Sequence, residues 1–199
     1  MSDARLYLIS PALGAADLAA FAPRFEAALS AGDVASVLLR LAPGADAKRV
    51  VPPLLEIAAA HDTALLIEDD ARLAARLGAD GVHVTAADVA DAVASSKGER
   101  IVGAGRLRLR DDAMAAGEAG ADYVLFGEPV HGVAPPLEST RERVEWWAEI
   151  FQTPCVAYAA EAAAVAPLAA AGADFVALGD FVWDGDAAEV VRAAIQALK

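Results

Sequence analysis

The chain is poor in cysteine and lysine: among its 199 residues it has one cysteine, Cys155, and three lysines, Lys48, Lys97 and Lys199. A single cysteine excludes an internal disulfide and suits a reducing compartment, so we expect a cytoplasmic protein. No run of residues is long and apolar enough to span a bilayer. The chain also does not open with a basic segment followed by an apolar core, so neither membrane insertion nor export is expected.

Positive charge is scarce as well. Sixteen Lys and Arg residues face 29 Asp and Glu residues, which gives a formal net charge of -13. An acidic balance of this size argues against nucleic acid or an anionic membrane as a partner. Hydrophobic residues make up 57% of the chain, which excludes a disordered protein.

One phrase recurs three times, as LGADGVHV (77–84), AGADYVLFG (119–127) and AGADFVALG (171–179). Each copy follows an Ala-rich helical pattern, and Gly78, Gly120 and Gly172 fit the left-handed position that ends a helix. Ala-Asp then leads into a short, almost wholly apolar run. Continuous apolar runs are typical of strands covered on both faces, as in parallel sheets.

With this unit as a guide, eight strands are predicted, at 6–10, 35–41, 64–68, 82–85, 101–105, 124–128, 155–159 and 175–179. Helical patterns separate them, for example at 18–31, 50–61, 72–77 and 187–198. Eight parallel strands alternating with helices predict a single-domain (β/α)8 TIM barrel over residues 1–199. An open doubly wound sheet is the alternative, but the third, fourth, sixth and eighth strands are too regular to favour it.

In such a barrel, reacting groups lie at the carboxyl ends of the strands. The predicted ends carry polar side chains throughout, namely Ser10, Arg40, Glu68, Asp69, Thr85, Asp88, Arg106, Glu128, Tyr158 and Asp180. A carboxylate-rich pocket is therefore expected, although the fold alone does not say what it does.

The three GAD phrases, with LLIEDDARLAARLGADGVHV (65–84), IVGAG (101–105) and the ending PCVAYAA…AAAGADFVALGDFV, resemble thiamine-phosphate synthase and its TenI-like relatives over nearly the whole chain. The resemblance implies thiamine biosynthesis on a (β/α)8 barrel. These transferases join an aminopyrimidine diphosphate to a thiazole phosphate, and a magnesium ion assists the departing pyrophosphate. A pyrimidine- or thiazole-type ligand is thus implied.

Position by position, the resemblance places Asp69 and Asp88 on the two metal aspartates of the family, so Mg²⁺ is the implied cofactor. The arginine of the second strand is matched by Arg40. The residues expected to contact the ligand are Arg40, Glu68, Arg106, Tyr158 and Asp180.

Much of the family's phosphate-binding pattern is replaced. The altered positions are Leu38, Ala42, Glu68, Gly105-Arg106-Leu107, the loop HGVAPPLEST (131–140), Ala159-Ala160 and Asp180. Near the last strand, Asp180, Asp184 and Asp186 put carboxylates where helix amides would meet a phosphate, so they are expected to cap the helix themselves. Each like charge costs an anion on the order of 1 kcal/mol in a partly wet site. We therefore expect ordinary synthase activity to be absent.

Glu128 follows Phe126-Gly127, where thiazole tautomerases of the TenI branch place a histidine. A partly desolvated glutamate with a raised pKa would shuttle a proton, which makes Glu128 the candidate catalytic acid/base. The alternative is a salt bridge from Glu128 to Arg106 or Arg40 on the rim.

Several other residues have two interpretations. Asp69 or Asp70 is a candidate N-cap for the helix that begins near residue 71, as well as a candidate metal ligand. His83 lies within a strand and is interpreted as an interior histidine, whereas His131 is the histidine expected near the pocket.

The adjacent tryptophans at 146 and 147 indicate packing or a homo-oligomer contact, with one ring more exposed than the other. Two functional classes stay open. One is an enzyme, or enzyme descendant, of thiamine metabolism. The other is a non-catalytic, regulatory barrel that binds a small cationic or amine-bearing ligand.

Overall fold

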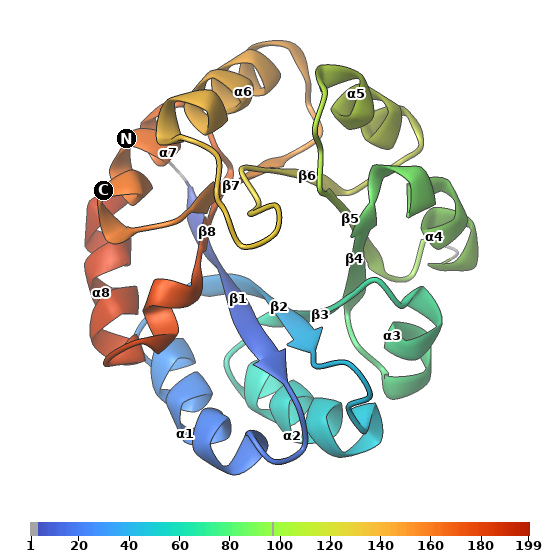
Figure 1. Cartoon of the computed structure of the whole chain (residues 1–199), viewed down its shortest axis with the longest axis vertical. Coiled ribbons are helices and arrows are strands. Elements are labelled where there is room, and N and C mark those ends of the chain that lie inside the picture. Colours follow the sequence, from blue (N-terminus) through green and yellow to red (C-terminus); the bar gives the residue numbers. More distant parts are fainter. Residues whose placement is uncertain (1–3, 97) are drawn as a thin grey trace.

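The computed structural model describes residues 4–96 and 98–199. Eight parallel strands form a closed barrel in the order β1 to β8, and β8 pairs with β1 (Figure 1). The strands are β1 (Arg5–Leu13), β2 (Val34–Leu41), β3 (Ala64–Glu68), β4 (Gly81–Thr85), β5 (Ile101–Gly105), β6 (Tyr123–Phe126), β7 (Cys155–Ala159) and β8 (Phe175–Leu178). The predicted (β/α)8 barrel is confirmed, because a closed sheet excludes the open doubly wound alternative.

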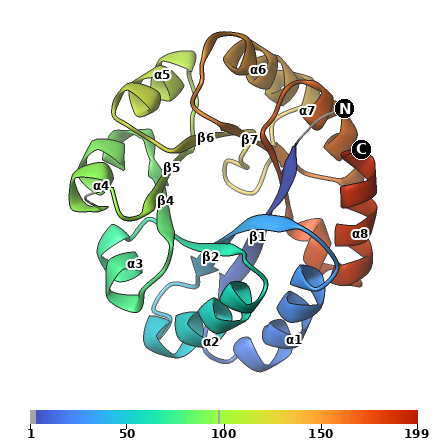
Figure 2. The same cartoon turned by 180° about the vertical axis from the view of Figure 1, so that it is seen from behind.

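A ring of helices surrounds the barrel in both face views (Figures 1 and 2). They are α1 (Leu18–Leu29), α2 (Ala47–Ala60), α3 (Ala71–Leu77), α4 (Val89–Ser96), α5 (Arg110–Glu118), α6 (Leu137–Ile150), α7 (Val165–Ala170) and α8 (Ala187–Ala197). Within the described residues, no helix is long and apolar enough to cross a membrane.

Side chains alternate along each strand between the helix-facing layer and the barrel interior. Leu6 and Leu8 of β1 belong to the layer beneath the helices. Tyr7 and Ile9 belong to a separate interior cluster that also holds Leu38, Leu66, Tyr123, Leu125, Val156 and Tyr158. Along each strand, the next residue that faces the interior after this cluster lies at the carboxyl end of the barrel. The candidate site is at that end.

The aspartate of each repeated phrase ties two strands together at the amino end of the barrel. The Asp80 carboxylate accepts the N–H of Leu65, at 2.8 Å. In the same way Asp122 accepts from Val102 at 2.7 Å, and Asp174 from Cys155 at 2.8 Å. The preceding glycines have φ of 74°, 92° and 100°, as a left-handed helix end requires. The repeat is thus a structural device of the barrel.

Two strands, β1 and β6, end at least two residues away from their predicted ends, whereas the other bounds agree to within one residue. Strand β1 continues to Leu13, past an irregularity in its pairing with β2, so Ser10 lies buried inside the strand. Strand β6 ends at Phe126, two residues earlier than predicted, because Gly127 has a φ of 89° and turns the chain. This turn directs Glu128 toward β5, where its carboxylate meets the backbone N–H of Arg106.

Candidate functional site

A cavity of about 590 Å³ lies at the carboxyl end of the barrel, and we call it the mouth cavity. Four predicted ligand contacts line it together: Arg40, Glu68, Tyr158 and Asp180. The first three extend the inward-facing positions of β2, β3 and β7 by one step of two residues, which is why they converge. Phe181 and Asp184, which sequence reasoning did not select as ligand contacts, complete its polar and aromatic wall.

Carboxylates dominate the charge of the mouth cavity. Glu68, Asp180 and Asp184 share its wall with one guanidinium, that of Arg40. The Arg40 Nε lies 3.5 Å from a Glu68 oxygen and, among the described residues, has no hydrogen-bond partner. Burial, followed by the nearby charge of Asp180, raises the pKa of Tyr158, so its hydroxyl is a neutral donor at neutral pH.

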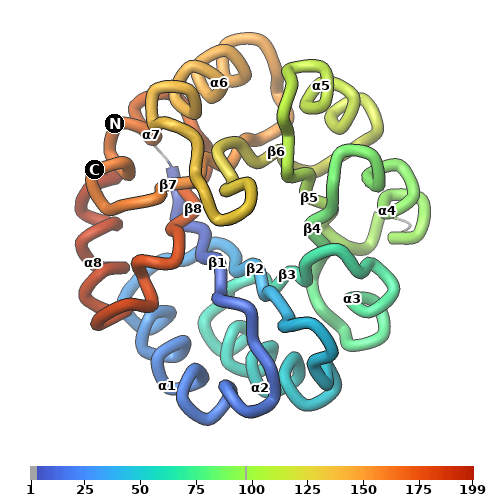
Figure 3. Tube along the Cα trace, in the orientation of Figure 1, coloured from blue at the N-terminus to red at the C-terminus, as the bar shows by residue number. Residues whose placement is uncertain are grey.

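The chain after β6 crosses the open end of the barrel as a tight hairpin (Figure 3). Val130 and Val133 exchange two backbone hydrogen bonds, of 2.9 and 3.1 Å. The turn residues His131 and Gly132 both have positive φ, 51° and 79°, which is the geometry favoured for a two-residue hairpin. Gly132 lines the mouth cavity, while His131, the histidine expected near the pocket, lies exposed at the tip.

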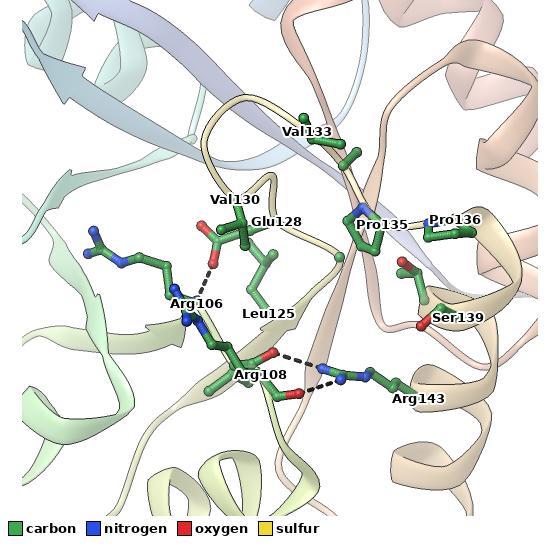
Figure 4. A pocket seen from close by; sticks show the side chains of 14 residues that line it. Arg106, Arg108, Leu125, Glu128, Val130, Val133, Pro135, Pro136, Ser139 and Arg143 are labelled. Carbon is green, nitrogen blue, oxygen red and sulfur yellow. Dashed lines mark hydrogen bonds between the residues drawn. The ribbon is translucent and has the colours of Figure 1, made fainter.

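Arg106 and Glu128 line a second cavity, of about 440 Å³, to which this hairpin contributes Val130 and Val133. We call it the side cavity. Figure 4 shows Arg106, Arg108 and Glu128 on one wall and Ser139 and Arg143 of α6 on the opposite wall. The predicted ligand residues thus fall into two groups, one in each cavity.

A chain of hydrogen bonds runs through the barrel interior to Glu128. The hydroxyls of Tyr7 and Tyr123 lie 2.8 Å apart, and the Tyr123 hydroxyl lies 2.8 Å from His83 Nδ1. His83 Nε2 lies 3.3 Å from Glu128 Oε1, and the other Glu128 oxygen accepts the Arg106 N–H at 2.5 Å. The His83 and Glu128 side chains are only 1% and 6% exposed, so this is a buried pair.

The raised pKa expected for Glu128 is wrong. Burial does favour the neutral form and is the largest single influence, but the charge and hydrogen bond of His83, the Arg106 N–H and the charge of Arg40 together outweigh it. The pKa of Glu128 is therefore lowered, and the group is a carboxylate at neutral pH. Its alternative role, a rim salt bridge to Arg106 or Arg40, is also wrong, because those guanidinium groups pair with Asp69 and Glu68.

Two glycines of β5 leave the space that these buried, hydrogen-bonded side chains occupy. A Cβ on Gly105 would lie 2.1 Å from His83 Nε2 and 2.2 Å from Glu128 Oε2. A Cβ on Gly103 would lie 2.0 Å from the Tyr123 ring. Sequence reasoning identified His83 as interior but missed its link to Glu128. Gly103 and Gly105 are two residues apart in β5, so both face the barrel interior. Two interior positions without a side chain were the available signal that side chains of the neighbouring strands fill this space.

The two predicted metal ligands follow adjacent strands, β3 and β4. Asp69 and Arg106 both have left-handed backbones, with φ of 63° and 55°, and their side chains form an ion pair. Asp88 accepts a hydrogen bond from the Thr85 hydroxyl. Among the described residues, no group of three or more His, Cys, Asp or Glu side chains is placed to hold a metal ion. A metal role for Asp69 and Asp88 stays a prediction.

The helix-capping alternative is decided for one residue of the acidic run. Asp70 is the N-cap of α3, and its carboxylate accepts the Leu73 N–H at 2.8 Å. Asp186 likewise caps α8 by accepting the Glu189 N–H at 3.1 Å. Asp69 is therefore free of the capping role that the sequence left open.

Several known proteins are similar to this chain in sequence or in fold. The family model described as "Thiamine monophosphate synthase" matches residues 6–181. A thiamine-phosphate synthase of Rhodospirillum centenum is 43% identical, over 98% of this chain and 96% of the relative. One of Erythrobacter litoralis is 41% identical, over 70% and 67%. Among solved structures, the thiamine phosphate pyrophosphorylase of Pyrococcus furiosus superposes with a TM-score of 0.79 at 20% identity, covering 99% of this chain and 96% of that one. The chain belongs to the thiamine monophosphate synthase family.

Proposed function

We propose that this family member binds a small heterocycle of the pyrimidine or thiazole type in the mouth cavity and lacks ordinary synthase turnover. The charge of that cavity carries the proposal: three carboxylates line it together with one guanidinium, that of Arg40, which already lies beside Glu68. Transfer from a diphosphate requires cations and hydrogen-bond donors around the departing group. Here the departing pyrophosphate would meet mainly like charge.

An uncharged or cationic amine-bearing ring suits the same walls. Tyr158 and Phe181 offer aromatic surface, and the carboxylates of Glu68 and Asp180 can accept hydrogen bonds from an amino group. A cavity of about 590 Å³ has the volume that small-molecule sites commonly have. The names of the relatives support a ligand from thiamine metabolism.

Asp69 and Asp88 are the residues that would hold Mg²⁺. Their chemistry fits, because Mg²⁺ is commonly bound through one or two carboxylates with water in its remaining positions. Bound there, the ion would offset the negative charge of a nearby anionic group. Arg106 competes with a cation for Asp69, so we expect weak binding that an Asp69→Ala, Asp88→Ala double variant abolishes in a magnesium titration by calorimetry.

Proton transfer is a second candidate activity, favoured by the buried His83–Glu128 pair beside the side cavity. With its lowered pKa, Glu128 would act as a base toward a bound heterocycle in a tautomerase-like reaction. A non-catalytic, regulatory role for the same barrel predicts ligand binding without turnover of any kind.

Calorimetry with an aminopyrimidine alcohol and its diphosphate ester tests the main proposal. We expect the alcohol to bind more tightly than the diphosphate. Asp180→Asn should weaken the alcohol and strengthen the diphosphate, whereas Asp91→Asn, on the outer helix α4, should change neither. Tighter binding of the diphosphate by the unaltered protein would overturn the proposal.

A further inference from the structure

Strand β1 has a bulge where it approaches the mouth cavity. Ile9 pairs with Leu38 of β2. The next paired residues are Ala12 and Arg40, so three steps along β1 match two steps along β2. Pro11 lies in this bulge, where its lack of an N–H removes no regular ladder bond. Bulges commonly re-aim a side chain beside a functional site, and Arg40, directly after this one, lines the mouth cavity.

A side chain, rather than a backbone carbonyl, accepts the N–H of Arg40. The Ser10 hydroxyl accepts this N–H at 2.9 Å and donates to the Pro11 carbonyl at 2.8 Å. Ser10 is fully buried, so water does not compete for either bond. The backbone of Arg40, and with it the direction of its guanidinium, therefore depends on the Ser10 hydroxyl.

The acidic wall of the mouth cavity is fixed to the same bulge. This wall comes from η3 (Asp180–Trp183) and the next residue, Asp184. The last residue of η3, Trp183, donates its indole N–H to the carbonyl of Ile9 at 2.7 Å. Ile9 is the residue at which the bulge begins. One bulge thus holds a guanidinium of the cavity on one side and two of its carboxylates on the other.

Helix α1 holds the same segment from outside the barrel. The Trp183 ring is buried and packs against Phe21, with the ring centroids 4.8 Å apart. Arg24 donates to the backbone carbonyls of Trp183 and Gly185, the latter at 3.1 Å. Arg24 forms no ion pair with any described residue, so its guanidinium serves these carbonyls. The segment that carries Asp180 is therefore held by both β1 and α1.

We propose that Ser10 and Trp183 are positioning residues that set the charge balance of the mouth cavity. Ser10 places Arg40, and Trp183 places Asp180 and Asp184. Neither is among the described residues that line the cavity, so both act through the groups that do. The choice between an amine-bearing ring and a diphosphate rests on the proposed function, whereas the placement of the charges is measurable without any ligand.

The hydroxyl of Tyr158 reports the position of these charges. Burial raises the pKa of Tyr158 most, the charge of Asp180 raises it further, and the charge of Arg40 lowers it. The Asp180 backbone hydrogen bond lowers this pKa to a smaller extent, and the charge of Glu128 raises it. Titration of ¹³C-labelled tyrosine by NMR measures the pKa, and Tyr158→Phe identifies the signal.

We expect Ser10→Ala and Trp183→Phe to change the pKa of Tyr158 in opposite directions. Without the hydroxyl, the Arg40 N–H turns toward water to regain a partner and carries the guanidinium away, so the pKa rises. Without the indole N–H, Asp180 moves outward, so the pKa falls. General loosening of the fold would instead expose Tyr158 and lower its pKa in both variants.

Two controls remove bonds of the same kind far from the cavity. Ser96→Ala removes a buried hydroxyl of α4 that donates to the Val93 carbonyl. Trp147→Phe removes a buried indole N–H that donates to the Thr153 carbonyl. Both should keep the pKa of Tyr158. A pKa unchanged in either positioning variant, or lowered in Ser10→Ala, would overturn the proposal.

Calorimetry with the aminopyrimidine alcohol and its diphosphate ester extends the test to ligand choice. Relative to the alcohol, the diphosphate should bind about fivefold more weakly in Ser10→Ala and about fivefold more tightly in Trp183→Phe, the scale of one hydrogen bond. An unchanged ratio in both variants would contradict their role in ligand choice. A preference of the unaltered protein for the diphosphate would contradict the proposed function alone, because the Tyr158 titration needs no ligand.

Discussion

Gly105 has no side chain, and the Glu128 and His83 side chains occupy the space that a side chain there would need. Gly105 is one of the positions where this chain departs from the thiamine-phosphate synthase pattern, and here any Cβ would overlap His83 and Glu128. We predict that Gly105→Ser forces the buried pair apart and lowers the free energy of unfolding by about 1–3 kcal/mol, as overpacking of a core does. Chemical denaturation measures this change. Gly185→Ser is the matched control, because nothing lies within 4 Å of its Cβ position.

The lowered pKa of Glu128 predicts a particular pH dependence. A carboxyl group with a lowered folded pKa stabilises the protein above its unfolded pKa, about 4.3, and that contribution is lost as the pH falls through the folded value. Unfolding free energies should therefore fall more steeply between about pH 5 and about pH 3 in the unaltered protein than in Glu128→Gln. At neutral pH the variant should be less stable by about 1–3 kcal/mol.

A control separates this effect from general charge repulsion. Glu26→Gln removes an exposed carboxylate of α1 and should leave the acid limb of the stability curve unchanged. Equal slopes for Glu128→Gln and the unaltered protein would mean that the buried pair has no influence on acid stability.

The polar residues at the predicted strand ends made several lining residues of the mouth cavity predictable from the sequence. Arg40, Glu68 and Tyr158 converge as expected because the strands are parallel and their inward positions follow from alternation. The partner of Glu128 was not predictable in the same way. It depends on the turn at Gly127, whose positive φ redirects the chain, and on His83 of β4, which lies 45 residues earlier in the sequence.

The aspartates of the three GAD phrases join neighbouring strands at the amino end of the barrel, away from the site. We predict that Asp122→Ala leaves the Val102 N–H without its partner at 2.7 Å and lowers the free energy of unfolding by about 1–2 kcal/mol. Ligand affinities at the carboxyl end should not change, because this end of the barrel serves stability.

Asp122→Asn retains an acceptor oxygen and should recover most of the lost stability in the same denaturation experiment. Asp91→Ala, on the outer face of α4, provides the baseline for removing a carboxylate. A change in ligand affinity in Asp122→Ala as large as that in the mouth variants would contradict the separation of the two ends.

Element order and topology were predictable because the repeat marks helix ends and buried strands with the same residues each time. The bounds of β1 and β6 were not, since a bulge beside Ser10 and a single left-handed glycine decide them. The hairpin at 130–133 carries its turn signal in His131-Gly132, which the sequence presents only as part of a proline-rich loop.

At the scale of the whole molecule, the net charge of -13 is unevenly distributed between the two cavities. The mouth cavity has three carboxylates around one arginine, while the side cavity has three arginines around one carboxylate. The hairpin after β6 contributes residues to both cavities, so its position affects the shape of both. The two cavities therefore differ in the sign of the charge that lines them.

We infer that this member of the family lacks ordinary synthase turnover, because the mouth cavity is lined mainly by carboxylates. The direct measurement mixes the purified protein with the aminopyrimidine diphosphate, the thiazole phosphate and Mg²⁺, and follows the formation of thiamine phosphate. We expect no product above the level without protein, while calorimetry on the same preparation still detects binding of the unphosphorylated aminopyrimidine. Robust turnover that Asp69→Ala and Arg40→Ala abolish would contradict it.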